Sequence, residues 1–248
     1  MNIELSIVVP SYHTGAKLTV SLVPKLAVLN KLSVPFELIL VLDGPDILAE
    51  QQFQELNKTN PQLILISLPV NMGKGHAVRR GMEVAKGNYI GYMDVDNDID
   101  ADILSQMYKA IRIKQADAIL PSKRHPASKV NYPKSRKLFS TFYNIYVRYL
   151  LGLKISDTQL GAKLYRRELV TAVIPDCRIN GFIFELEMLE LAKDQGFNQF
   201  LEIPVKLNLE TESTIGVGNS WRIIKETLWL TWNYKIKPKK RKPEKKKL

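Results

Sequence analysis

The alternation of short apolar runs with helix-like segments is the feature that most constrains the fold. Short apolar runs rich in Val, Ile and Leu are typical of strands buried on both faces of a parallel sheet. The expected strands are 5–9, 36–42, 63–68, 88–93 and 118–120, and the clearest helices between them are 16–29 and 75–86. The sequence therefore predicts an α/β fold, with a mostly parallel sheet covered by helices on both faces.

Polar loops follow four of these expected strands. They are Pro10–Tyr12, Asp43–Asp46, Asn71–Gly75 and Asp94–Asp98. In open α/β sheets, ligands bind outside the carboxyl ends of the strands, where such loops meet. We therefore expect these four loops to form one binding site.

The acidic segment that starts at Asp94 is the most specific of these loops. Asp94, Asp96 and Asp98 alternate at the end of a strand, so they can face the same way and share one cation. Mg²⁺ or Mn²⁺ takes few protein carboxylates and completes its shell with substrate phosphate oxygens. A calcium loop of the EF-hand type is excluded because Ile99 and Ser105 stand where it needs Gly and Glu. A solvated acidic turn is the alternative.

The glycine-containing loop 71–75 matches no standard nucleotide fingerprint. Val78 occupies the third glycine position of a dinucleotide motif, and Gly75 after Lys74 breaks the P-loop pattern. Lys74 beside a helix N-terminus suits an anion, such as a donor phosphate, but such loops are also common in plain turns.

A helix-like stretch from Arg136 to Arg148 places polar residues at every fourth position. Arg136 and Ser140 belong to this polar side, and aromatic residues lie opposite them. One interpretation is a helix that lines the site, with Arg136 and Ser140 facing a phosphate and the aromatic side of the helix facing lipid. An amphipathic helix packed on the core is the other.

The C-terminal part of the chain combines an apolar stripe with a basic tail. The stripe consists of Trp221, Ile224, Leu228 and Trp232, and the tail 235–248 carries +8 of the net charge of +11. A tryptophan stripe followed by polybasic residues favours an anionic membrane surface, with nucleic acid as the less favoured partner. We expect a catalytic domain over 1–218, a membrane-surface helix over 219–234 and a disordered tail over 235–248.

The location within the cell follows from what the sequence lacks. Cys177 is the only cysteine, which excludes an intramolecular disulfide and agrees with a reducing cytosol. No secretory signal and no apolar window of about 20 residues is visible. We therefore expect a cytoplasmic protein that is peripheral at the cytosolic face of a membrane. The oligomeric state is not predicted.

The order of motifs resembles the dolichyl-phosphate mannose synthase and polyprenyl-phosphate glycosyltransferase family, which has the GT-A type of Rossmann-like fold. The resemblance runs from Ile3 to about Leu207. In chain order the shared motifs are 8–12 (VVPSY), 41–44 (VLDG), 73–75 (GKG), 94–96 (DVD), 122–124 (SKR), Arg136 with Ser140 and Asn144, 157–163 (DTQLGAK) and 181–187 (GFIFELE).

The resemblance also implies roles for individual residues. Asp96 and Asp98 would bind metal, and Val95 with Asp96 would lie against the diphosphate. The residues implied to hold the base and ribose are Pro10, Tyr12, Val41 and Asp43. The residues implied to receive the acceptor phosphate are Arg124, Arg136 and Ser140. Glu210 departs from the pattern, because the family usually has an Arg for the diphosphate near this position.

The implied reaction is an inverting transfer of a sugar from a UDP- or GDP-linked donor to a polyprenyl phosphate. A phosphate acceptor is already anionic at pH 7 and needs no general base. A saccharide acceptor is the alternative, with Asp157 or Glu185 as the base it would need. A non-catalytic membrane- or nucleic-acid-binding protein is the alternative of another class, which the Glu210 departure favours and the intact acidic segment disfavours.

Overall fold

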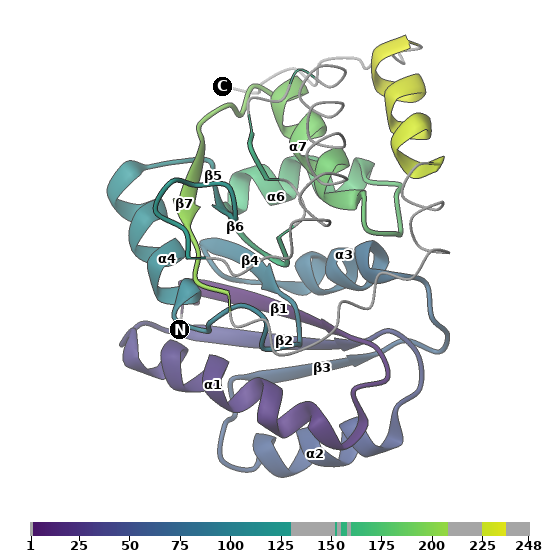
Figure 1. Cartoon of the computed structure of the whole chain (residues 1–248). Helices are drawn as coiled ribbons and strands as arrows, with labels where there is room; N and C mark the ends of the chain where they lie inside the picture. The colour runs from purple at the N-terminus through teal and green to yellow at the C-terminus, as the bar shows by residue number, and fades with distance from the viewer. Residues whose placement is uncertain (1, 130–151, 153–154, 158–159, 208–224, 237–248) are drawn as a thin grey trace.

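The fold is built on a seven-stranded sheet. The computed structural model describes residues 2–129, 152, 155–157, 160–207 and 225–236, which Figure 1 draws as coloured ribbon. Within these residues the strand order is β3-β2-β1-β4-β6-β5-β7, and β6 alone runs antiparallel to its neighbours. The strands are β1 (Leu5–Ser11), β2 (Phe36–Leu42), β3 (Leu63–Ser67), β4 (Tyr89–Met93), β5 (Ala118–Ser122), β6 (Ala162–Arg166) and β7 (Phe200–Pro204).

The predicted mostly parallel sheet is confirmed; the five expected strands differ from the observed ones only at their ends, and β6 and β7 come in addition. β1 continues two residues beyond the predicted end, because Pro10 and Ser11 still pair with Val41 and Leu42 of β2. β5 is also longer by two residues, since Pro121 and Ser122 pair with β7. The antiparallel strand β6 was not predicted, because its partners are far away in the sequence.

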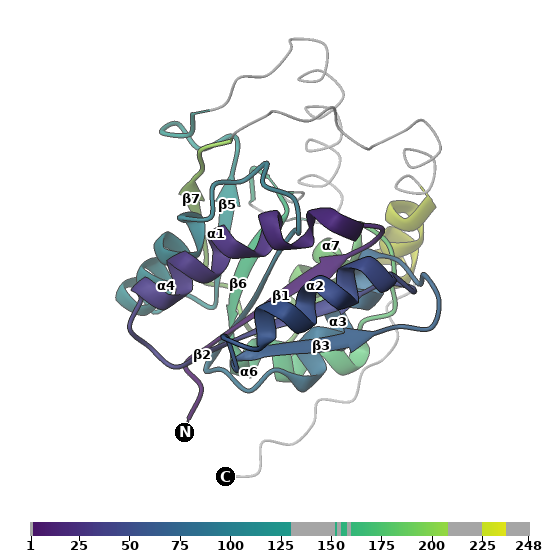
Figure 2. The same ribbon diagram turned by 90° about the horizontal axis from the view of Figure 1, so that it is seen from below.

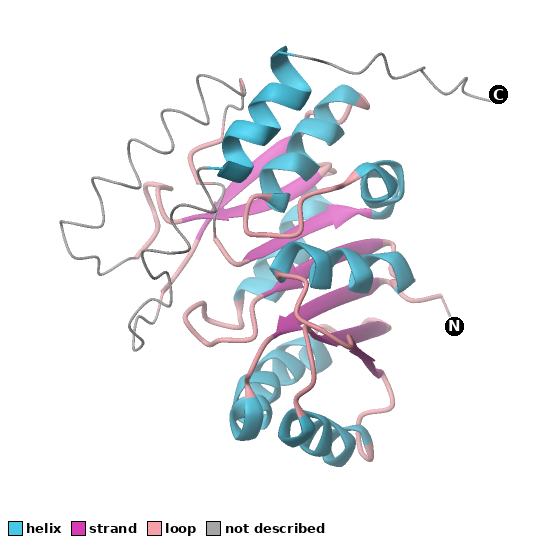
Figure 3. Ribbon diagram, turned by 90° about the vertical axis from the view of Figure 1, so that its right-hand side faces the viewer, coloured by secondary structure: helices cyan, strands magenta, loops and turns pink. Residues whose placement is uncertain are grey.

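Helices cover both faces of the sheet, as predicted (Figures 2 and 3). One face carries α1 (Leu18–Lys31), α2 (Ile47–Asn57) and α4 (Ile103–Lys114). The opposite face carries α3 (Lys74–Val84), α6 (Arg167–Val173) and α7 (Phe184–Asp194). The predicted helix 16–29 begins instead with a 3-10 turn, η1 (Gly15–Lys17), and a second such turn, η2 (Ile174–Asp176), follows α6.

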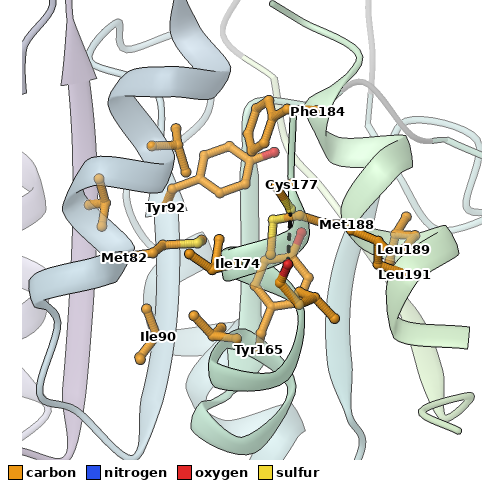
Figure 4. Close-up of a cluster of buried hydrophobic side chains, with 14 of the residues drawn as sticks. Met82, Ile90, Tyr92, Tyr165, Ile174, Cys177, Phe184, Met188, Leu189 and Leu191 are labelled. Carbon is orange, nitrogen blue, oxygen red and sulfur yellow. Dashed lines mark hydrogen bonds between the residues drawn. The ribbon is translucent and has the colours of Figure 1, made fainter. Parts of the chain in front are cut away.

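Each helical layer has its own apolar core against the sheet. In the layer of α3, α6 and α7, Tyr92 of β4 packs on Phe184 of α7 with ring centroids 5.6 Å apart (Figure 4). Met82, Tyr165 and Cys177 lie in the same cluster. This core fixes α3 and α7, whose N-terminal ends carry Lys74 and Glu185.

The last described segment is a helix over 225–231 that continues as the π-helix η3 (Trp232–Ile236), drawn in yellow at the edge of the molecule in Figure 1. Leu230 is fully buried and Thr227 nearly so, which places this side of the helix against the body. None of the helices in the described part of the chain is long and apolar enough to span a bilayer.

The order in which the strands are connected determines where the candidate site lies. From β1 the chain proceeds outward through β2 and β3, and then returns to place β4 on the other side of β1. β1 and β4 are parallel neighbours, so the loops that follow them leave the sheet side by side, at the point where the strand order reverses. Ligands of doubly wound sheets bind at such a point, and the acidic segment 94–98 follows β4 there.

Candidate functional site

The loop after β2 is tied to the glycine-containing loop by one carboxylate. Asp43 is 3% exposed, and its two oxygens accept hydrogen bonds from the main-chain amides of Met72 and Gly73, each at 2.8 Å. Gly73 has a φ of 104°, a conformation that favours glycine, and α3 starts at the next residue. Asp43 thus sets the position of Lys74.

Lys74 joins the start of α3 to the end of β4. Its Nζ lies 2.8 Å from Oδ1 of Asp94 and 2.9 Å from Oδ2. Burial alone would lower the pKa of Lys74, but Asp94 and then Glu185 outweigh it, so the pKa is raised and the ammonium is retained. Gly161 lies against the Asp94 carboxylate so closely that a Cβ at this position would collide with it.

A second ion pair lies beneath the first. Lys163 of β6 is fully buried and pairs with Glu185 of α7, and its Nζ also donates to the Tyr92 hydroxyl at 3.1 Å and to a main-chain carbonyl. Glu185 lies 3.4 Å from Lys74 Nζ. Asp94, Lys74, Glu185 and Lys163 therefore form a chain of alternating charges that leads from the sheet edge into the interior.

Beyond Asp94 the acidic loop is open to solvent. Asp96 is exposed and Asp98 is partly exposed. Although Asp96 as a whole residue is exposed, nearby protein atoms partly desolvate its carboxylate, and this desolvation together with the charges of Asp94 and Asp98 raises its pKa. Negative charge therefore accumulates on this loop.

The residues of this loop fit a hard divalent cation. Oxygen ligands with excess negative charge suit Mg²⁺ or Mn²⁺, which keep several positions for water and substrate phosphate. No group of three or more His, Cys, Asp or Glu side chains in the described parts of the chain forms a ready metal cage. The chain therefore offers a partial ligand set of Asp96 and Asp98, while Asp94 is paired with Lys74.

The residues expected to hold the donor nucleoside differ in accessibility. Tyr12 is 54% exposed at the end of β1, so its ring is available. Pro10 and Val41 are buried within the sheet, and both oxygens of Asp43 face backbone amides. Neither Pro10 nor Val41 therefore exposes its side chain to a ligand.

The residues expected to receive the acceptor phosphate are described only in part. Arg124 is exposed on the loop after β5, at the same edge of the sheet. Arg136 and Ser140 lie outside the described residues, as does the whole predicted helix 136–148. The structure therefore places one of the three predicted residues on the expected edge.

The two candidate general bases are both buried. Asp157 is 3% exposed and accepts a hydrogen bond from the main-chain amide of Lys123 at 2.9 Å. Glu185 is 2% exposed and is held between Lys163 and Lys74. A base must reach the proton that it removes, and neither carboxylate is exposed enough to meet a saccharide hydroxyl in this structure.

The C-terminal helix contacts the body through polar side chains. Glu226 accepts from the amide of Ile183 at 3.4 Å, and the Tyr234 hydroxyl donates to Glu187 at 2.8 Å. The outward side consists of Leu228, Trp229 and Trp232, which are 56%, 43% and 50% exposed. Two members of the predicted stripe, Leu228 and Trp232, thus face solvent; Trp221 and Ile224 lie outside the described residues.

Two buried lysines near the site, Lys25 and Lys163, were not predicted from the sequence. Each is flanked by residues of the apolar core, Lys25 within the buried side of α1 and Lys163 within the central strand β6. A lysine at a position where the pattern requires an apolar residue is rarely fully buried unless it is paired. That conflict between pattern and residue type is the signal that could have identified both.

Comparison with known sequences assigns the chain to a family. A profile described as Glycosyl transferase family 2 matches residues 6–173. The glycosyltransferase AglD of Haloferax volcanii is 27% identical over 82% of the chain and 33% of its own length. A dolichyl-phosphate beta-glucosyltransferase of Dictyostelium discoideum is 29% identical over 82% of the chain and 64% of its own length. The chain thus spans less than two thirds of the length of these relatives.

Solved structures share the fold at low sequence identity. Glucosyl-3-phosphoglycerate synthase of Mycobacterium tuberculosis, crystallised with Mn²⁺, UDP and glucosyl-3-phosphoglycerate, has a TM-score of 0.69 at 16% identity, over 92% of this chain and 80% of its own. Mannosyl-3-phosphoglycerate synthase of Rubrobacter xylanophilus has a TM-score of 0.70 at 15% identity, over 98% and 78%. These likenesses confirm the predicted GT-A-type fold.

Proposed function

Because the chain belongs to glycosyl transferase family 2, we propose that it transfers a sugar from a nucleoside-diphosphate sugar to a polyprenyl phosphate at a membrane surface. The observation that supports this proposal most directly is that the acidic loop, Lys74 and the end of β1 lie together at one edge of the sheet. The names of the dolichyl-phosphate beta-glucosyltransferases among its relatives support the lipid acceptor. The donor nucleotide, UDP or GDP, is left open.

The donor diphosphate is proposed to bind over the acidic loop. Asp96 and Asp98 would hold Mg²⁺ or Mn²⁺, which when bound neutralises the charge that develops on the leaving diphosphate. Lys74 adds a positive charge at the same edge of the sheet, where its Nζ lies 2.8 Å from Oδ1 of Asp94. Val95 is proposed to lie against the diphosphate, and the exposed ring of Tyr12 against the base.

The acceptor phosphate is proposed to be its own nucleophile. Its oxygen attacks the anomeric carbon, the bond from that carbon to the diphosphate breaks, and the nucleoside diphosphate leaves in a single displacement that inverts the anomeric centre. No proton has to be removed, because a phosphate monoester is anionic near neutral pH. Arg124, Arg136 and Ser140 are proposed to position this phosphate.

The burial of Asp157 and Glu185 favours the phosphate acceptor over the saccharide acceptor. Glu185 lies between two lysines, and Asp157 is held by the Lys123 amide. Both carboxylates therefore serve the packing of the site, and a hydroxyl nucleophile would lack a base. The alternative with a saccharide acceptor would require one of them to become accessible.

Membrane attachment is proposed for the outward side of the C-terminal helix and the tail that follows it. Leu228, Trp229 and Trp232 present exposed apolar surface, and residues 235–248 add a net charge of +8. An apolar face together with basic residues gives the two signals that stable interfacial binding needs. We place the protein at the cytosolic face, as a catalytic domain with a peripheral anchor.

The acceptor class is tested by offering two matched lipids that differ in one group. A short polyprenyl phosphate and the same polyprenol without the phosphate are incubated with radiolabelled UDP- and GDP-sugars and Mn²⁺. The proposal predicts labelled lipid from the phosphate alone. Equal labelling of the free alcohol, or labelling of saccharides only, would contradict the phosphate-acceptor reaction.

A further inference from the structure

Lys25 is a charged residue buried where the helix pattern requires an apolar one. It lies in α1 between Leu22 and Leu29 on the side that packs against the sheet, and its exposed fraction is 0%. Burying an ammonium group is strongly unfavourable unless its donors are satisfied. The contacts of Lys25 must therefore account for its position.

Those contacts lead directly to the acidic loop. The Nζ of Lys25 donates to the main-chain carbonyls of Val95 and Asp96, each at 3.1 Å, and to Oδ1 of Asn97 at 3.3 Å. A further bond at 3.0 Å goes to the carbonyl of Ser21, one turn earlier in α1. Lys25 thus binds three consecutive residues of the loop without using the carboxylate of Asp96.

A second contact between α1 and the loop has its origin in Pro24. Proline has no amide hydrogen, so the carbonyl four residues earlier, that of Val20, loses its helical partner. The side-chain amide of Asn97 donates to this carbonyl at 3.3 Å. Because of Pro24 and Lys25, this turn of α1 binds residues 95–97 of the acidic loop.

We propose that Lys25 is a positioning residue that holds the backbone of the acidic loop so that Asp96 and Asp98 remain directed to the cation. This inference rests on the proposed role of the acidic loop in metal and donor binding. In this proposal Lys25 holds the main chain of the acidic loop from the α1 side of the sheet, whereas Lys74 binds the carboxylate of Asp94 from the α3 side.

The chemistry of lysine suits this position. Its compact ammonium group has three hydrogens that point in different directions and are shared among the four acceptors around it, whereas the planar fork of arginine is larger. Its charge lies near Asp94 and Asp96, so it reduces the repulsion between these carboxylates. A neutral side chain of the same length would keep the packing of α1 and lose both effects.

The test measures metal binding instead of turnover. Purified protein is titrated with Mn²⁺ alone, and free Mn²⁺ is followed by electron paramagnetic resonance. We expect Lys25→Met to weaken Mn²⁺ binding by at least about tenfold, the range seen when residues that orient metal ligands are removed. The melting temperature should fall, because Lys25→Met leaves the acceptors of the ammonium group without their donor, so binding is compared well below the melting temperature of the variant.

Matched variants separate the possible outcomes. Lys31→Met, in the last turn of the same helix and exposed, should bind Mn²⁺ as the wild type does. If Lys25→Met does not fold, Lys25→Gln keeps one donor group and should weaken Mn²⁺ binding in the same direction. Wild-type affinity in a folded Lys25 variant would overturn the inference while leaving the proposed function intact. Absence of Mn²⁺ binding by the wild type, or unchanged binding by Asp96→Asn, would overturn the metal assignment and the role of Lys25 with it.

Discussion

The surroundings of the acidic loop and the C-terminal helix depart from ordinary burial in opposite ways. Next to the loop, charged side chains are buried: Lys25 and Lys163 are 0% exposed and Glu185 is 2% exposed. On the helix, apolar side chains face solvent: Leu228 and Trp232 are 56% and 50% exposed. Buried charges need partners that fix them, whereas exposed apolar surface marks a contact with another surface.

This difference indicates that the region of the acidic loop and the C-terminal helix have different roles. The loop region is held by ion pairs and main-chain hydrogen bonds, which suits the orientation of a donor and a cation. The C-terminal helix is joined to the body by Glu226 and Tyr234 and presents its aromatic side outward. Changes in the loop should therefore alter chemistry, and changes on the outer side of the helix should alter attachment.

The largest effect is expected from Asp96→Asn. This change keeps the size of the side chain and removes a charge that would hold the cation, so transfer should fall by about a thousandfold. Initial rates with saturating donor and Mn²⁺ measure it. Asp102→Asn is the matched control, because Asp102 is exposed just beyond the loop and should leave the rate unchanged. A normal transfer rate in Asp96→Asn would contradict the proposed role of the acidic loop in the reaction.

The next effect is expected from Gly161→Ala. The added methyl group would collide with the carboxylate of Asp94 and displace it from Lys74. A shift of this size near the reacting groups should lower the transfer rate by about a hundredfold. Steady-state rates and the melting temperature are measured together.

Gly81→Ala provides the control for Gly161→Ala. A Cβ at Gly81 would collide with Val8 in the core, away from the acidic loop. It should reduce stability by about 1–3 kcal/mol, as overpacking does, and leave the rate per folded molecule unchanged. Equal rates for the two variants would show that the position of Asp94 has no catalytic consequence.

A smaller effect is expected from Trp232→Ser on the outer side of the helix. Losing the burial of this side chain in the lipid interface should weaken binding to vesicles of anionic phospholipid by about tenfold. Vesicle sedimentation measures this, and transfer to a soluble short-chain acceptor should be unaffected. Ile113→Ser is the control, because Ile113 is 76% exposed but lies on α4. Equal losses in both variants would argue against a dedicated membrane face.

The smallest effect is expected from Tyr234→Phe, which removes one hydrogen bond between the helix and Glu187. Such a bond contributes about 1 kcal/mol, so the melting temperature should fall by about 2–4 °C. Differential scanning calorimetry can resolve this shift. An unchanged melting temperature would indicate that Tyr234 does not help to dock the helix.

Much of the fold was predictable because its strands are local apolar runs. The strand 36–42 was predicted with its observed bounds, and the four polar loops meet at one edge as expected. The position of β6 was not predictable, because it depends on pairing with β4 and β5 across long sequence separations. Sequence pattern reports local burial, and strand order is set by contacts that the pattern does not contain.

The site was predicted as a set of loops, but not with its internal contacts. The alternation of Asp94, Asp96 and Asp98 suggested one shared cation, yet Asp94 pairs with Lys74. Spacing cannot show this pairing, because the partner lies 20 residues earlier in the chain. The buried residues Lys25 and Lys163 stand out within apolar stretches of the sequence, but most of their partners could not be predicted, because they come from other elements of the fold.

The most direct test of the account is transfer of radiolabel from UDP- and GDP-sugars to a short polyprenyl phosphate, with Mg²⁺, Mn²⁺ or EDTA, by the wild type and by Asp96→Asn. The account predicts labelled lipid with a divalent cation, and loss of that product with EDTA and in the variant. Lipid product that persists with EDTA would contradict the metal-dependent mechanism, and donor binding without any lipid product would contradict the polyprenyl-phosphate acceptor.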